Sequence, residues 1–404
     1  MLTSTKFSNA PVLLAGLLIV AFGAWLRLSD SFAGALGPGY DERLYSSFLD
    51  TLRQTGSYPD LVKSYLAGEA GVSEKRVSPM RCLPLLHAWA WSSLSGRGSY
   101  QSLMDVSAMV SILMLPLSGA LGYRLGGNRA GLAITALMSV APLQVYMAHR
   151  SLMDGYFSFW MLLMMWLLWE CLEGSHKLWP PLLLGASWTL LLLCKETSAF
   201  VWLGTLLALL FVRTSEGRWP GPRTWAALAL GPAVGLALLL WLCGGPSPFL
   251  ALIQAYLTKQ MPQFVLLHAN GPWWGYLLAS LILSPLVSLM AWGGLLGVGG
   301  KERSSRLLAV ISLTTLAIPT AFPLIVPRLL TAADFPLRWL CWMQIRTATD
   351  RIKRPEISAL LTAVLVAGLC AAEFANFYLI FQKNGVYEPT CDVLLWVFKV
   401  VPQI

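Results

Sequence analysis

The sequence has 404 residues, of which 56% are hydrophobic and 12% are charged, and its mean hydropathy is +0.62. Soluble domains carry roughly 25% charged residues, so these charges could not coat the surfaces of two or three soluble domains. The composition also excludes a disordered chain and a small disulfide scaffold, which leaves a polytopic membrane protein.

Stretches of about 20 apolar residues, the length that crosses roughly 30 Å of hydrocarbon, predict eleven transmembrane helices. Two are weak, because 178–194 opens with Pro180-Pro181 and 329–345 contains Asp334 and Arg338. We therefore expect an all-α protein with one transmembrane domain over residues 1–404. The approximate spans are 10–28, 103–123, 130–147, 152–172, 178–194, 198–212, 223–243, 273–297, 306–326, 329–345 and 357–380.

The distribution of Lys and Arg predicts the orientation in the membrane. With the N-terminus in the cytoplasm, the short inner segments hold 14 of the 29 cations and six acids. The long outer segments 29–102, 244–272 and 381–404 are nearly balanced in charge. The net charge of +9 is therefore a topology signal, and no nucleic-acid partner is expected. An odd number of spans places the C-terminal tail outside, with no soluble domain after it.

The segment Ala33-Gly34-Ala35 has the small-residue form of a signal-peptide cleavage site. The apolar run before it has about 18 residues, and Lys6 is the only cation that precedes it. These features favour an uncleaved membrane anchor.

The first outer loop, about 29–102, contains two adjacent carboxylates, Asp41 and Glu42, after a Gly-Pro-Gly turn. Two amphipathic stretches, Leu44–Leu52 and Leu83–Leu94, suit helices that lie in the membrane interface. A carboxylate at this surface can accept a proton from an attacking hydroxyl or bind a metal ion. The alternative is that both residues only begin a helix, where acids favour the helix dipole.

Other outer segments also gather polar residues. His149 and Arg150 precede Asp154, which lies just inside an apolar helix, where insertion of a charge costs about 2.5–3.5 kcal/mol. A local Arg150–Asp154 pair at i, i+4 spacing would also account for it. Lys195 is placed to meet an anionic head group, and Arg328 precedes the weak span 329–345.

The order of these segments resembles the GT-C membrane glycosyltransferases, above all the protein O-mannosyltransferases and lipid A aminoarabinose transferases. The resemblance covers nearly the whole chain. It is carried by Tyr40-Asp41-Glu42, Arg81-Cys82-Leu83-Pro84-Leu85, Leu125-Gly126-Gly127 through Pro142, His149-Arg150-Ser151-Leu152-Met153-Asp154, Leu193-Cys194-Lys195-Glu196-Thr197, His268 to Tyr276, Arg328 to Asp334, and Tyr387-Glu388-Pro389.

The resemblance implies an inverting hexosyl- or pentosyltransferase in a bacterial plasma membrane. It would move one sugar from a polyprenyl-phosphate donor to a glycolipid, glycan or protein acceptor at the outer face. Asp41 would be the general base, and Glu42 and Asp154 would orient the acceptor or stabilise positive charge. The other implied roles are phosphate binding by Lys195, Arg150 and Arg328, and substrate binding by Tyr40, Arg43, His149, His268 and Tyr387.

The resemblance leaves metal use open, since Asp41, Glu42 and Asp154 could hold a divalent cation but some relatives work without one. A transporter or flippase of a lipid or glycan is the alternative from another class. It is disfavoured because the middles of the predicted spans are nearly free of charge, and because no matched broken helices or Walker sequence are visible. A polymerase or ligase of surface glycans also stays open.

Overall fold

The computed structural model describes residues 10–32, 38–68, 78–174, 177–217, 219–260, 274–297, 302–320, 327–387 and 389–400. Every regular element in these residues is a helix, and η marks a 3-10 or π-helical turn. The elements are α1 (Ala10–Leu28), η1 (Asp30–Phe32), α2 (Tyr40–Thr55), α3 (Tyr58–Ala67), α4 (Cys82–Ser95), α5 (Ser99–Ser139), α6 (Pro142–Ala148), α7 (Met153–Leu172), α8 (Trp179–Cys194), α9 (Ser198–Glu216), α10 (Pro222–Leu242), α11 (Pro246–Ala255), η2 (Tyr256–Gln260), α13 (Gly275–Leu283), α14 (Pro285–Leu296), α15 (Arg303–Thr320), η4 (Pro327–Ala333), α16 (Asp334–Thr349), α17 (Pro355–Phe377), η5 (Tyr378–Lys383) and α18 (Cys391–Val397).

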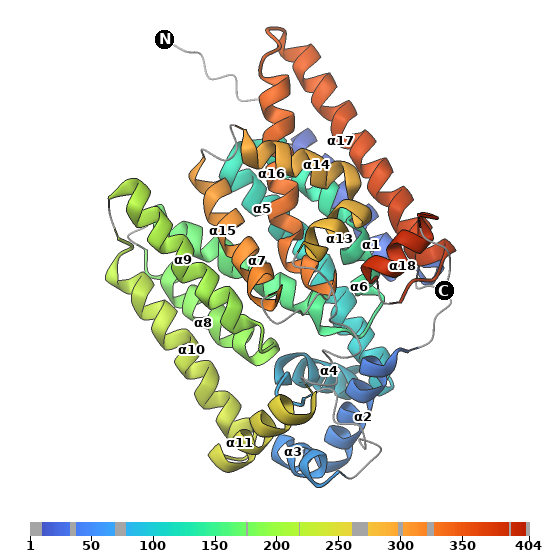
Figure 1. The fold of residues 1–404 in the computed structure, drawn as a ribbon, viewed down its shortest axis with the longest axis vertical. Coiled ribbons are helices and arrows are strands. Elements are labelled where there is room, and N and C mark those ends of the chain that lie inside the picture. The colour runs from blue at the N-terminus through green and yellow to red at the C-terminus, as the bar shows by residue number, and fades with distance from the viewer. Residues whose placement is uncertain are drawn as a thin grey trace.

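Short helices form a layer at one end of the molecule. Figure 1 shows α2, α3, α4 and α11 gathered there, while the turn between α16 and α17 lies at the opposite end. Between the two ends, α1 packs on α5, α8 on α10, α9 on α15 and α14 on α16. The two segments predicted as helices, Leu44–Leu52 and Leu83–Leu94, are helical and form parts of α2 and α4. The sequence analysis missed α3 between them.

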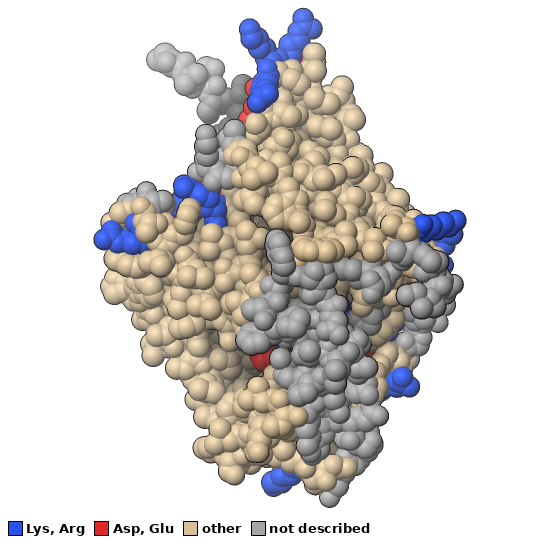
Figure 2. All heavy atoms as spheres, viewed as in Figure 1, with Lys and Arg blue, Asp and Glu red and all other residues tan. Residues whose placement is uncertain are grey.

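The surface of the long helices is apolar. Figure 2 shows broad areas without charged side chains, and the visible Lys and Arg lie around the outline of the molecule. On α1, Leu13 is 65% exposed and Leu18 is 63% exposed. Large exposed apolar surfaces are rare on soluble monomers and are typical of helices that face lipid, so the fold is that of a membrane-embedded protein.

Five helices among the described residues are long and apolar enough to cross a membrane. Three shorter apolar helices accompany them in these residues, and the number of eleven spans stays a prediction. The five are Ala10–Leu28, Ser99–Ser139, Met153–Leu172, Pro222–Leu242 and Pro355–Lys383, and the shorter ones are Trp179–Cys194, Ser198–Thr214 and Pro285–Leu296.

Three spans that the sequence predicts as continuous are interrupted. The predicted span 130–147 begins after a kink at Gly127, where φ is +77°, and its helix ends at Ser139 before α6. The predicted span 273–297 is divided at Ser284, because Pro285 lacks the amide hydrogen that would continue the helix. The predicted span 329–345 begins as the 3-10 turn η4 before α16 takes over.

Two buried arginines cap the helix end at Ser139. Arg27 donates to the carbonyl oxygens of Met138 at 3.0 Å and Ser139 at 2.8 Å. Arg338 Nε donates to the carbonyl oxygen of Leu137 at 3.1 Å, and neither arginine is more than 2% exposed. The last carbonyls of a helix have no partner within it and need one where water is absent. The arginines supply that partner, which allows the chain to leave the helix inside the bundle.

Candidate active site

The acidic pair of the first loop begins α2. Asp41 and Glu42 lie in its first turn, and the Glu42 carboxylate accepts a hydrogen bond from the Gly39 amide at 2.8 Å. Both acids therefore begin a helix, as the alternative interpretation expects, and their negative charges interact favourably with the positive end of the helix dipole. The two side chains nevertheless differ in surroundings.

Glu42 is fully buried and joins α2 to the chain between α6 and α7. Its carboxylate pairs with Arg150 and accepts from the amide of Ser151 at 2.8 Å and from the Ser151 hydroxyl at 3.2 Å. Protein donors therefore engage both of its oxygens. Arg150 pairs with Glu42, and not with Asp154, which the i, i+4 spacing in the sequence suggested as its partner.

Tyr387, near the C-terminal end of the sequence, contacts Arg150 and Tyr146 on this side of the site. The Arg150 guanidinium lies 4.4 Å from the centre of its ring, and its carbonyl oxygen accepts from the Tyr146 hydroxyl at 2.7 Å. A Cβ atom on Gly39 would lie 1.9 Å from the Cζ and hydroxyl oxygen of Tyr387, so a larger residue there would displace the Tyr387 side chain. The first loop and the C-terminal segment therefore meet at the start of α2.

Asp41 is the first member of a row of side chains with alternating charge, which continues through Arg328 and Asp154 to Lys195. Its carboxylate lies 3.3 Å from the Arg328 guanidinium, and a second guanidinium nitrogen of Arg328 lies 4.0 Å from Asp154. Asp154 also pairs with Lys195. The Asp41 side chain is 25% exposed, whereas those of Arg328, Asp154 and Lys195 are at most 8% exposed. Asp41 is therefore the carboxylate of this group that an incoming molecule can reach.

The turn that carries Lys195 is tied to the first loop by an ion pair that the sequence analysis did not single out. Arg81 binds both carboxylate oxygens of Glu196 and donates to the Tyr45 hydroxyl at 2.5 Å. Burial raises the pKa of Glu196, but the charge and hydrogen bonds of Arg81 outweigh burial, so that pKa lies below its ordinary value. Arg81 and Glu196 each belong to one of the motifs that carry the resemblance, and this was the signal in the sequence that could have identified them.

Four carboxylates and four cations therefore gather between the layer of short helices and the bundle. Each carboxylate is paired with a cation, and the cluster as a whole is neutral. Its members are Asp41, Glu42, Asp154, Glu196, Arg81, Arg150, Lys195 and Arg328.

The remaining predicted site residues have other surroundings. His149 is buried and its Nε2 lies 2.7 Å from the carbonyl oxygen of Leu26, and burial lowers its pKa. Arg43 is exposed on α2, and Tyr40 packs partly against the main apolar core. His268 lies outside the described residues.

The three carboxylates considered for a metal ion do not form a common ligand set. Asp41, Glu42 and Asp154 each pair with a protein cation. In the part of the chain that the structure describes, no group of three or more His, Cys, Asp or Glu side chains could hold a metal ion.

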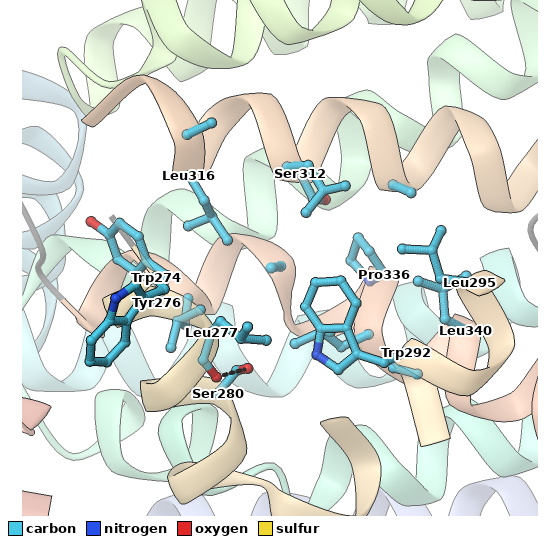
Figure 3. Close-up of a pocket in the computed structure, with 17 residues that line it drawn as sticks. Trp274, Tyr276, Leu277, Ser280, Trp292, Leu295, Ser312, Leu316, Pro336 and Leu340 are labelled. Carbon is cyan, nitrogen blue, oxygen red and sulfur yellow. Dashed lines mark hydrogen bonds between the residues drawn. The ribbon is translucent and has the colours of Figure 1, made fainter. Parts of the chain in front are cut away.

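An apolar cavity of about 240 Å³ lies beside η4, among α13, α14, α15 and α16. Leu330 and Ala333 of η4 belong to its wall, so one short element separates it from the charge cluster. Figure 3 shows Trp274 and Tyr276 near one end of the cavity and Leu295 and Leu340 near the other. Its shape and lining suit a hydrocarbon chain.

The structure was compared with solved structures. It matches ArnT from Cupriavidus metallidurans bound to undecaprenyl phosphate with a TM-score of 0.59 and 14% identity, over 97% of this chain and 76% of ArnT. It matches the apo oligosaccharyltransferase of Archaeoglobus fulgidus with a TM-score of 0.65 and 10% identity, over 99% of this chain and 59% of that enzyme. The chain has the GT-C fold.

A third match with the GT-C fold is the A. fulgidus oligosaccharyltransferase AglB in complex with an inhibitory peptide and a dolichol-phosphate. It has a TM-score of 0.63 and 11% identity, over 99% of this chain and 59% of AglB. This chain thus spans less than two thirds of the archaeal enzyme. No family model matches the sequence, and no curated protein matches it.

The Arg81–Glu196 pair predicts an acid-sensitive step in stability. Because the pKa of Glu196 is lowered on folding, its contribution is complete above the ordinary value of 4.5 and is lost as the pH falls through the lowered pKa. Melting temperatures of the purified protein measured from pH 7 to pH 3 test this. The Glu196→Gln variant should lose part of the decline below pH 4.5, and an unchanged decline would contradict the assignment.

Proposed function

We propose that this protein is an inverting glycosyltransferase that moves one sugar from a polyprenyl-phosphate donor to an acceptor at the outer face of the membrane. The observation that carries the proposal is the pairing of the partly exposed Asp41 with Arg328, next to Asp154 and Lys195. A partly exposed carboxylate thus lies beside two cations within a GT-C fold, and this arrangement suits a base next to a phosphate site. ArnT, which has this fold, binds undecaprenyl phosphate.

The proposed reaction needs no group that the cluster lacks. The acceptor hydroxyl attacks the anomeric carbon from the face opposite the phosphate, and its proton passes to the Asp41 carboxylate. The bond between the anomeric carbon and the phosphate oxygen breaks, and the leaving polyprenyl phosphate keeps the electron pair. Arg328 and Lys195 face the phosphate and stabilise the charge that it gains.

The charge balance of the cluster supports this assignment. The donor phosphodiester carries one negative charge, and the released polyprenyl phosphate carries two. Asp41 becomes neutral when it takes the acceptor proton, so the net charge of the cluster and substrates does not change. A site with little water favours such a sequence, because an uncompensated buried charge is costly there.

The position of the cluster supports action at the outer face. The layer of α2, α3, α4 and α11 lies at the end opposite the α16–α17 turn (Figure 1). Arg351, Lys353 and Arg354 in and beside that turn are exposed. Because excess cations mark the cytoplasmic side, the charge cluster is assigned to the other side.

The cavity beside η4 is proposed to hold the first part of the donor's hydrocarbon tail. A lipid whose phosphate lies against Arg328 can enter the cavity past Leu330 and Ala333, which belong to the same short element. A tail held there would add apolar burial to the charge pairing of the phosphate. Long-chain donors would therefore bind more tightly than short-chain ones.

Asp41→Asn tests the catalytic assignment. Loss of the base should lower the rate of sugar transfer by about 10²–10⁴-fold, while the melting temperature and membrane insertion persist. The readout is the release of polyprenyl phosphate from a panel of polyprenyl-phosphate hexoses and pentoses in the presence of membrane glycolipid, glycan and peptide acceptors, measured by mass spectrometry. Asp60→Asn, at an exposed residue of α3, is the matched control, and full activity of Asp41→Asn would rule out this residue as the base.

Ala309→Phe tests the cavity. Ala309 is buried in its wall, so a phenyl ring there should raise KM for a long-chain donor about 3- to 10-fold while KM for a two-isoprene donor changes little. Ala363→Phe adds the same ring on the exposed side of α17 and should leave both values unchanged. Equal effects of Ala309→Phe on both donors would place the tail elsewhere.

A further inference from the structure

A second cluster of charged residues lies inside the bundle, apart from the candidate active site. Arg338 donates to Asp334 at 2.8 Å and to Glu373 at 2.6 Å, in addition to the helix-end carbonyl of Leu137. Glu373 also accepts from the Ser284 hydroxyl at 2.9 Å. All of these side chains are buried, and the proposed reaction uses none of them.

The cluster joins the points at which three predicted spans are interrupted. Leu137 belongs to the helix end before α6, Ser284 divides α13 from α14, and Asp334 follows η4 directly. Arg27 binds the same helix end through Met138 and Ser139. One hydrogen-bonded network therefore fixes where the irregular segments of the bundle begin and end.

Two of these segments lead directly to the candidate active site. The chain that leaves the capped helix end passes through α6 to Arg150. The turn η4, which ends at Ala333 directly before Asp334, carries Arg328. The two segments also touch, because the Gln144 amide donates to the Thr331 carbonyl oxygen at 3.1 Å. The Thr331 hydroxyl in turn lies 3.3 Å from the backbone oxygen of Asp154.

We propose that Arg338, with Asp334 and Glu373, is a positioning residue for the lipid-phosphate site. By holding the start of α16 against the capped helix end and α17, it fixes the place at which η4 presents Arg328 to Asp41 and Asp154. The inference rests on the proposed function, since it gives the network a role in binding the donor phosphate. A purely structural network would alter only how much of the protein is folded.

The experiment compares Arg338→Gln with Arg346→Gln, which removes an arginine from the exposed far end of the same helix. The affinities of folded protein in lipid nanodiscs are measured for a polyprenyl phosphate and for the polyprenol of equal chain length. Arg338→Gln should bind the phosphate roughly tenfold more weakly and the polyprenol unchanged, because small displacements of a binding group cost this much or more. Arg346→Gln should match the wild type for both lipids.

Glu373→Gln is the second variant, and it tests the positioning role of the network if Arg338→Gln does not fold. It keeps the side-chain shape and the hydrogen bond with Ser284 but removes one charge from the network, so we expect a smaller loss, roughly threefold. Wild-type affinity for the polyprenyl phosphate in folded Arg338→Gln, or in folded Glu373→Gln if the first variant cannot be made, overturns the proposal.

Amide hydrogen exchange separates this proposal from the proposed function. If the wild-type protein does not bind polyprenyl phosphate more tightly than polyprenol, the proposed function fails. The rate of amide hydrogen exchange then becomes the only test of whether Arg338 positions the neighbouring segments. Exchange in 140–151 and 327–333 should then rise in Arg338→Gln or Glu373→Gln and not in Arg346→Gln. No rise in these segments overturns the positioning role as well.

Discussion

The structure depends on one constraint, which is that polar groups inside an apolar bundle must find their partners within the protein. The helix end at Ser139 satisfies it through Arg27 and Arg338. With these carbonyls bonded, the chain can leave the helix before it reaches the end of the bundle and form α6. The resulting irregular backbone lies next to the charge cluster, as is typical of membrane proteins, in which non-helical backbone is tolerated where protein surrounds it.

The candidate active site follows from the same constraint. Its four carboxylates and four cations neutralise one another, so the cluster can be buried before any substrate is present. Asp41 and Glu196 are partly exposed, each at 25%, whereas Glu42, which is next to Asp41 in the chain, is fully buried. The two adjacent acids thus have different partners and different burial, and the proposed reaction gives them different roles for that reason.

The sequence predicted the all-α membrane fold, the helices of the first loop, and the polar segments that meet at one end. It overlooked the break at Ser284, although Pro285 is a local signal for it. It did not predict the break after Ser139, because apolar periodicity does not reveal that a helix end will be capped by arginines distant in sequence. For the same reason it took the span interiors to be nearly uncharged, whereas Arg27, Arg338, Asp334 and Glu373 are buried there. Pairings such as Arg150 with Glu42 also depend on tertiary contacts, which local spacing cannot decide.

The central claim is that a lipid phosphate binds between Arg328 and Lys195 with Asp41 facing the sugar. A cryo-electron microscopy structure of the protein in a nanodisc with bound polyprenyl phosphate tests it directly. The account predicts phosphate density in contact with Arg328 and Lys195, and tail density that continues past η4 into the apolar cavity. Phosphate density elsewhere, above all at the opposite end near Arg351 and Arg354, would contradict it.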